Sequence, residues 1–187
     1  MDKTKFQNKY RIKSTRLENW DYSEDWWYFI TICVKDFRKC LGKIEKGEIK
    51  LTKIGFIVNE ELEKTEKLRK NVKIDEYVIM PNHVHMILII DNSYFRNISN
   101  KNLNYCRDAL QCVCTGSNKF GPQKNNLASI VRGFKGSVKR RCNKLNINFK
   151  WQARFYEHII RNEVSLEKIR LYIRNNPYKW EADEYYW

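Results

Sequence analysis

The chain has 187 residues, of which 42% are hydrophobic, and a formal net charge of +14. This length and composition are sufficient for one globular domain with a buried core, and they exclude a disordered chain. No apolar run is long enough to span a bilayer, and the first residues contain no apolar segment typical of a secretion signal. We therefore expect a cytoplasmic protein, and the charge favours a polyanionic partner such as nucleic acid.

The first half of the chain predicts mainly strands. Its apolar runs are rich in β-branched and aromatic residues, whereas one segment repeats its apolar residues at a helical period. We expect a strand over 28–34, a hairpin over 43–51 that turns at Lys46-Gly47, a helix over 53–70, a strand over 75–80, a turn at Pro81-Asn82 and a return strand over 83–90.

The second half predicts two helices around one strand. Residues 92–126 are polar and rich in Asn, which is typical of an inserted loop. We then expect a helix over 127–144, a strand over 155–160, a helix over 166–175 that is capped by Ser165 and stopped before Pro177, and a tail over 181–187.

This order of elements predicts an α+β protein. Its core would be one ferredoxin-like antiparallel sheet with helices packed on one face. We see no internal repeat and no boundary, so residues 1–187 are treated as one domain with a basic N-terminal arm at 1–27.

Two of the three histidines, His83 and His85, lie one residue apart in the return strand. Alternate residues of a strand point to the same face, so the two imidazoles can form half of a metal site. The other interpretation is a pair of half-buried polar residues at the start of a strand. The pattern alone leaves both open.

Tyr172 and Asn176 are four residues apart and share a face of the last predicted helix. An amide oxygen is a reasonable metal ligand, and a tyrosine beside a metal is a candidate nucleophile toward phosphorus. The structural alternative is that Tyr172 packs on the core and Asn176 caps the helix end. With eleven tyrosines in the chain, this spacing does not decide between them.

Positive charge is concentrated in residues 127–161, which contain nine Lys or Arg residues and one acid. Some of these residues repeat at helical spacing and form a basic stripe. A solvated basic surface would have the same pattern. Our candidates for DNA contacts, including three from the N-terminal arm, are Arg11, Lys13, Arg16, Arg132, Lys135, Lys139, Arg140 and Arg154.

Pro81-Asn82-His83-Val84-His85 resembles the HUH signature of single-tyrosine transposases, most closely their REP-associated branch. Further blocks in the order of that family lie at residues 10–17, 20–22, 130–136, 151–161 and 172–177. An isolated H-x-H pattern is a weak signal, but these blocks in this order are specific. The resemblance runs from about residue 9 to 180, interrupted by the predicted insertion.

The resemblance implies an HUH endonuclease-like fold and a metal-dependent transposase that cleaves and rejoins single-stranded DNA near hairpins through a 5′-phosphotyrosine. It assigns Tyr172 as the nucleophile and His83, His85 and Asn176 as ligands of Mg²⁺ or Mn²⁺. The implied partner is single-stranded DNA with a hairpin, either REP-like or at an element end. Relatives include dimers that exchange the tyrosine helix, so monomer and homodimer both stay open.

Two other functions are compatible with the residues. A zinc hydrolase would use His83, His85 and His158, which requires His158 on the same sheet face and an acidic general base. A non-catalytic nucleic-acid-binding protein, such as a domesticated transposase copy, requires no intact site. Within the transposase hypothesis, Tyr156 is the competing nucleophile because it also lies in a matching block.

Overall fold

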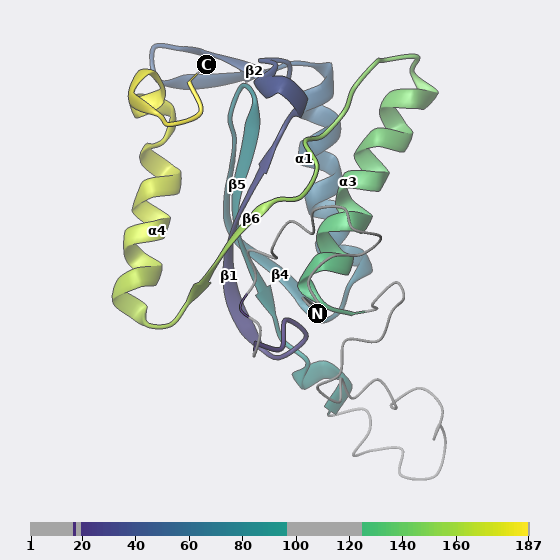
Figure 1. The fold of residues 1–187 in the computed structure, drawn as a ribbon, viewed down its shortest axis with the longest axis vertical. Coiled ribbons are helices and arrows are strands. Elements are labelled where there is room, and N and C mark those ends of the chain that lie inside the picture. The colour runs from purple at the N-terminus through teal and green to yellow at the C-terminus, as the bar shows by residue number, and fades with distance from the viewer. Residues whose placement is uncertain (1–16, 18–19, 97–124, 187) are drawn as a thin grey trace, which may run out of the picture.

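The computed structural model describes residue 17, residues 20–96 and residues 125–186 of the chain. Its main element is a four-stranded antiparallel sheet in the order β4-β5-β1-β6 (Figure 1). A two-stranded hairpin, β2-β3, lies near one end of this sheet. The strands are β1 (Trp26–Cys33), β2 (Gly42–Glu45), β3 (Glu48–Leu51), β4 (Val72–Ile79), β5 (His83–Ile90) and β6 (Tyr156–Ile160). The predicted α+β class is confirmed.

The predicted hairpin turn is confirmed at Lys46 and Gly47, whose φ angles are 52° and 80°. Two successive positive φ angles match the right-handed twist of the flanking strands. A Cβ atom at Gly47 would lie only 2.5 Å from the Tyr178 ring. Glycine is therefore required there both by the turn and by the segment that packs on it.

Helices cover both faces of the sheet. As predicted, α1 (Lys53–Leu68) and α3 (Leu127–Lys144) share one face, but α4 (Glu163–Asn175) lies against the other (Figure 1). The reason lies in β5, which is mostly apolar and is buried at nearly every position, so that both of its faces must be covered.

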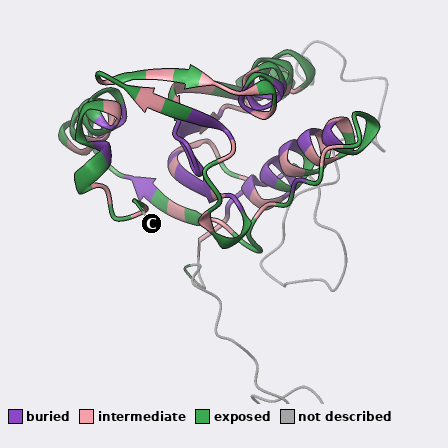
Figure 2. Cartoon of the chain, turned by 90° about the horizontal axis from the view of Figure 1, so that it is seen from above, coloured by how far each residue is buried: buried purple, intermediate pink, exposed green. Residues whose placement is uncertain are grey.

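The two faces have separate apolar clusters. Between the sheet and the pair α1 and α3, side chains such as Ile30, Val84 and Phe134 are almost fully buried. A smaller cluster joins α4 to the other face and consists of Ile87, Ile160, Leu166 and Ile173. Figure 2 shows the buried residues along the sheet and on the helix sides that face it. Burial of such side chains contributes about 1.5–3 kcal/mol each, which anchors α4 to the sheet.

Several boundaries differ from the prediction. The helix α4 begins three residues earlier, because Asn162 rather than Ser165 is its N-cap and accepts the Ser165 N–H at 2.8 Å. The strand β4 begins at Val72, not at residue 75. Pro177 ends α4 as predicted, but the chain continues as a 3-10 helix, η2 (Pro177–Ala182).

Most of the predicted insertion, residues 97–124, lies outside the described residues, as do residues 1–16 of the predicted arm. Within the described part, no helix combines the length and the apolar character needed to cross a bilayer.

Candidate functional site

His83 and His85 are the first and third residues of β5, and their exposed fractions are 0% and 1%. Their partners across the strand pair with β1 are Cys33 and Thr31. The two Nε2 atoms lie 2.9 Å apart. The expected placement of both imidazoles on one sheet face is therefore observed, and it is the face that α4 covers.

The hydrogen bonds around His83 determine its tautomer. The Asn82 side-chain amide donates to the Tyr185 carbonyl at 2.6 Å, so its oxygen faces His83. That oxygen can only accept, and it lies 2.8 Å from His83 Nδ1. Nδ1 therefore carries the proton, and the lone pair of Nε2 points toward His85.

The second histidine is oriented by Thr31, whose hydroxyl lies 2.8 Å from His85 Nδ1. A hydroxyl can donate or accept, so Thr31 can bind either tautomer of His85. Burial lowers the pKa of His85 to about 3 and that of His83 to about 2. Both imidazoles are consequently neutral at physiological pH, the form that binds a metal.

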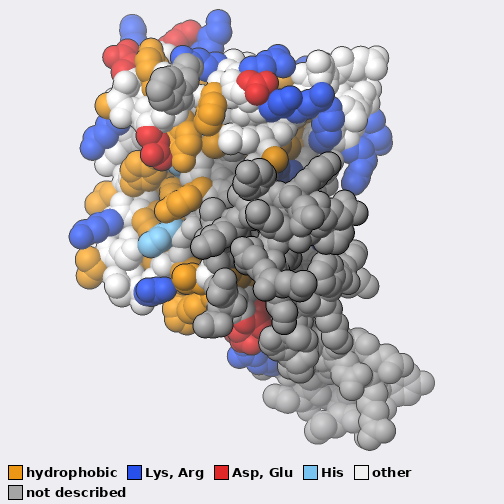
Figure 3. Space-filling model, viewed as in Figure 1, with side chains coloured by type: hydrophobic (Ala, Val, Ile, Leu, Met, Phe, Trp, Pro, Cys, Tyr) orange, Lys and Arg blue, Asp and Glu red, His pale blue; other side chains and the backbone are white. Residues whose placement is uncertain are grey.

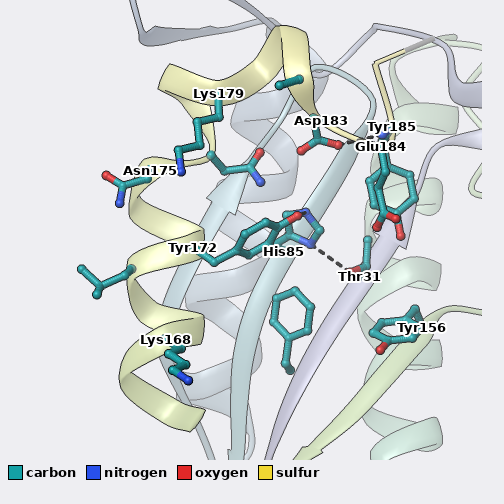
Figure 4. Close-up of a pocket in the computed structure, with 14 residues that line it drawn as sticks. Thr31, His85, Tyr156, Lys168, Tyr172, Asn175, Lys179, Asp183, Glu184 and Tyr185 are labelled. Carbon is teal, nitrogen blue, oxygen red and sulfur yellow. Dashed lines mark hydrogen bonds between the residues drawn. The ribbon is translucent and has the colours of Figure 1, made fainter. Parts of the chain in front are cut away.

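Tyr172 extends from α4 toward His85, and its hydroxyl lies 3.2 Å from His85 Nε2 (Figure 4). Its exposed fraction is 43%, so a substrate can reach the phenol. Burial of the phenol, followed by the negative charge of Asp183, raises the pKa of Tyr172 to about 12. The structure thus brings the predicted nucleophile to the histidine pair.

Asn176 lies one turn after Tyr172, at the C-cap of α4. It is 3% exposed, and its side-chain oxygen has no hydrogen-bond partner. An unpartnered buried oxygen is costly and requires an explanation, such as a ligand that is bound in another state. The predicted ligand role of Asn176 is compatible with this feature.

The structure adds Asp183, which sequence reasoning missed. Candidate ligand atoms of His83, His85 and Asp183 all lie within 4.8 Å of one another, and no other group of this kind is found in the described part of the chain. Asp183 follows η2 in what we predicted only as a tail. A single acid beyond a helix has no periodic relation to the histidines, so no sequence signal identifies it.

The segment after α4 is held against the strand ends by its aromatic residues. Trp180 is buried, with its ring 6.1 Å from that of His83. The Tyr185 ring lies 4.7 Å from His83 and stacks on Phe37 at 6.1 Å. The Lys39 ammonium lies 4.4 Å from the centre of the Tyr186 ring. These contacts place Asp183 over the histidine pair.

A cavity of about 880 Å³ lies between α4, β1, β5, β6 and the C-terminal segment, and His85 and Asp183 line it. Tyr172 and Asn176 line it beside the aromatic side chains of Phe29 and Tyr156. Lys168 and Lys179 add positive charge (Figure 4). Sequence reasoning also missed Lys168, although it lies four residues before Tyr172 and thus on the same helix face.

The predicted basic stripe lies on α3, across the sheet from α4 (Figure 1). Two of its lysines bond to backbone. The Lys135 ammonium donates to the carbonyls of Gln152 and Arg154 at 2.6 and 2.8 Å, and that of Lys139 donates to the Phe149 carbonyl at 2.6 Å. Both lysines therefore fasten the segment before β6 to the helix.

The remaining basic candidates differ in position. Arg132, Arg140 and Arg154 are exposed, and Figure 3 shows Lys and Arg side chains gathered over the upper part of α3 and the segment that follows it. Arg11, Lys13 and Arg16 lie outside the described residues. Among the predicted candidates in the described residues, the exposed cations of this surface are therefore the three arginines.

Two competing site residues are placed on β6. Tyr156 is 55% exposed and lines the cavity, with its ring 6.4 Å from that of Phe29. His158 is exposed and is not part of the group that His83 and His85 form with Asp183. The three-histidine arrangement that a zinc hydrolase would need is absent from the described residues.

The donor set fits a divalent metal ion. It combines two neutral imidazoles, the unpartnered oxygen of Asn176 and the Asp183 carboxylate, and nitrogen and oxygen donors of this kind are common ligands of divalent metals. Two nitrogen atoms that each lie ~2.05 Å from one ion are separated by about 2.9–3.3 Å, depending on the coordination geometry. The 2.9 Å between the two Nε2 atoms agrees with this range.

A comparison of amino-acid sequences identifies a relative of this chain. An uncharacterized protein of Haemophilus influenzae is 37% identical over 175 residues, which cover 93% of this chain and 92% of that protein. The two proteins belong to one family. No protein-family profile matches the sequence.

A solved structure, that of the REP-associated tyrosine transposase bound to a REP hairpin, matches with a TM-score of 0.57 and 20% identity. The match covers 90% of this chain and 74% of that one. The chain has the fold of this tyrosine transposase. The relationship that the motifs predict is thus confirmed at the level of the fold. A candidate transposase of Deinococcus radiodurans, with 13% identity and a TM-score of 0.44 over 88% of this chain and 97% of that one, is too distant to add to this.

Proposed function

We propose that this protein is a metal-dependent nuclease and strand transferase that acts on single-stranded DNA near hairpins through a covalent tyrosine intermediate. The observation that carries the proposal is the Tyr172 hydroxyl, 3.2 Å from His85 Nε2, in a cavity that Asn176 also lines. Tyr172 and His85 are 87 residues apart in the sequence, and the fold brings the candidate nucleophile to the candidate metal ligands. The hairpin bound by the structural neighbour supports a hairpin substrate here.

In the proposed reaction, the Tyr172 oxygen forms a bond to phosphorus while the bond between phosphorus and the 3′ oxygen breaks. The phenol loses one proton and the departing 3′ oxygen gains one, so the products are a 5′-phosphotyrosine and a 3′-hydroxyl. Attack by the 3′-hydroxyl of a second strand reverses these bond changes and rejoins DNA. No external energy source is needed.

His83, His85 and Asn176 would hold the divalent ion, which supplies Lewis-acid stabilisation of the charge on a phosphate oxygen. With a pKa of about 12, Tyr172 keeps its proton at neutral pH in the metal-free site. A metal ion held by His83 and His85 would add positive charge beside the phenol, and such a charge favours loss of that proton. The position of Tyr172 next to these two ligands would therefore make it a competent nucleophile.

We propose that Lys168 and Lys179 bind the backbone of the strand that enters the cavity, with Arg132, Arg140 and Arg154 as more distant contacts. Exposed aromatic side chains at the same opening, such as Tyr156, can stack on unpaired bases. Arg11, Lys13 and Arg16 keep their predicted role on the hairpin.

A covalent-adduct assay tests the proposal. The protein is incubated with hairpin-containing single strands, labelled at the 5′ or the 3′ end, in the presence of Mn²⁺ or Mg²⁺. We expect the label on the protein only when it lies 3′ of the nick. The adduct should be lost in Tyr172→Phe and reduced at least 100-fold in His83→Ala, since transition-state electrostatics typically account for factors of about 10²–10³.

Tyr156→Phe is the matched control, because it removes a second exposed phenol of the same cavity and should leave the adduct intact. An adduct that survives Tyr172→Phe but disappears in Tyr156→Phe would show that the nucleophile is misassigned. DNA binding without an adduct under any of these conditions would instead identify a non-catalytic, domesticated copy.

A further inference from the structure

We propose that Asp183 is a ligand of the same divalent metal ion as His83 and His85, so that the segment after the tyrosine helix helps to hold the ion. The inference rests on the proposed function and deepens it, because it adds a ligand that the HUH-like motifs do not contain. It also gives the C-terminal segment, whose role the sequence leaves open, a chemical part in the site.

The first argument is that electron-pair donors converge on one position. The lone pair of His83 Nε2 faces His85 Nε2 at 2.9 Å. The oxygen of Asn176 is buried without a partner in the same cavity. The Asp183 carboxylate lies within 4.8 Å of the two imidazole nitrogens. When His85 carries its proton on Nδ1, where the Thr31 hydroxyl can accept a hydrogen bond from it, both Nε2 lone pairs and the carboxylate face one another, and a cation between them removes the repulsion.

The second argument is that Asp183 is not neutralised by the protein. Among the described residues, no lysine or arginine forms an ion pair with this carboxylate. The carboxylate accepts hydrogen bonds from the Tyr185 N–H at 2.7 Å and from the Asn176 side chain, and these bonds orient the group but leave its charge in place. A half-buried carboxylate normally acquires a cationic partner, and a metal ion would be that partner.

The third argument is that Asp183 is held in position from both sides. Before it, Trp180 is buried and its carbonyl accepts the Asp183 N–H at 3.1 Å. After it, the Tyr185 carbonyl accepts from Asn82, the residue that also orients His83. One amide therefore couples the position of the segment to the orientation of a histidine ligand, and the carboxylate is preorganised.

The test measures Mn²⁺ binding to the full chain by calorimetry after removal of metal with a chelator. We expect Asp183→Asn to weaken Mn²⁺ binding at least 10-fold, since loss of even an outer-shell partner typically costs 10- to 100-fold. Glu184→Gln is the matched control. It removes the same charge from the next residue of the same cavity, and we expect a change below threefold.

A change of metal preference supplies a second readout that a purely structural role would not produce. In Asp183→Cys, a soft thiolate replaces a hard carboxylate, so binding should shift from Mn²⁺ toward Cd²⁺ by at least 10-fold relative to the wild type. Unchanged preference in Asp183→Cys, or equal small effects of Asp183→Asn and Glu184→Gln on Mn²⁺ binding, would overturn the inference.

The outcomes separate this inference from the proposed function. If His85→Ala abolishes Mn²⁺ binding while Asp183→Asn retains it, Asp183 is not a ligand and the proposed nuclease stands. If Asp183→Asn loses Mn²⁺ but the wild type forms no DNA adduct, the metal site stands and the nuclease fails. A wild-type protein that binds no Mn²⁺ at millimolar concentration would overturn both.

Discussion

At the scale of single residues, the site depends on side chains that orient other side chains. Thr31 is 2% exposed and makes its hydrogen bond to His85 Nδ1, on the side of the ring away from the other histidine. Asn82 does the same for His83. The Asn82 oxygen determines which nitrogen of His83 has the lone pair, whereas Thr31 restricts the orientation of the His85 ring. They are positioning residues, and neither has a predicted role in the motif.

Thr31→Val should therefore affect metal binding without touching a ligand. Valine keeps the shape of threonine but cannot hydrogen bond, so we expect Mn²⁺ affinity to fall about 10-fold. The free energy of unfolding should fall by only ~1 kcal/mol, the usual contribution of one hydrogen bond. Calorimetry and chemical denaturation measure the two quantities. Thr31→Ser should retain the affinity, and a Thr31→Val protein with wild-type affinity would rule out the positioning role.

At the scale of secondary-structure elements, the site requires α4 to be docked on the sheet at one rotation and height. Its apolar side packs through Leu166 and Ile173. Its polar anchor is a bidentate ion pair, in which the Arg170 guanidinium contacts the two Asp75 carboxylate oxygens at 2.7 and 2.8 Å. Two parallel bonds restrict orientation more than a single bond does. The pair thus sets where Tyr172 meets His85.

Arg170→Gln should loosen this docking. We expect the free energy of unfolding to fall by about 1 kcal/mol, and adduct formation to fall at least 10-fold, because small displacements of a nucleophile are costly. Arg174→Gln is the matched control, since it removes the more exposed pair with Glu76 on the same two elements. Equal loss of adduct in both variants would contradict a specific role for Arg170.

At the scale of the whole molecule, the sheet separates the main hydrophobic core from the candidate active site. One face carries the large apolar core with α1 and α3, and the other carries the cavity with Tyr172. The net charge of +14 is compatible with DNA binding on either side. The contacts of Lys135 and Lys139 with backbone carbonyls indicate, however, that part of the predicted basic stripe stabilises the fold.

This separation predicts different effects for two lysines. Lys168→Ala, in the cavity, should reduce the slope of log affinity against log salt for single-stranded DNA by about 0.7, the value for one phosphate contact. Lys139→Ala should leave the slope unchanged and lower the melting temperature instead. Fluorescence anisotropy at several salt concentrations and thermal denaturation test both. Reversed effects would mean that DNA crosses α3 and not the cavity.

The sequence by itself determined the element types, the hairpin turn at Lys46 and Gly47, and the local spacing of the candidate site residues. These follow from local patterns: strand alternation places His83 beside His85, and helical spacing places Tyr172 above Asn176. Local patterns do not determine which face of a sheet a helix covers. The sequence therefore predicted all helices on one face, and it missed the cap at Asn162 because Asn and Ser are both good N-caps.

Only the tertiary structure decided that the histidine strand and the tyrosine helix meet, and that Asp183 joins them. Such contacts depend on the packing of α4 on the second apolar face of β5 and on the aromatic side chains that hold the C-terminal segment in place. They join residues about 90 or more positions apart. No local period encodes a separation of that size, because burial of apolar surface is non-directional and its outcome depends on the whole fold.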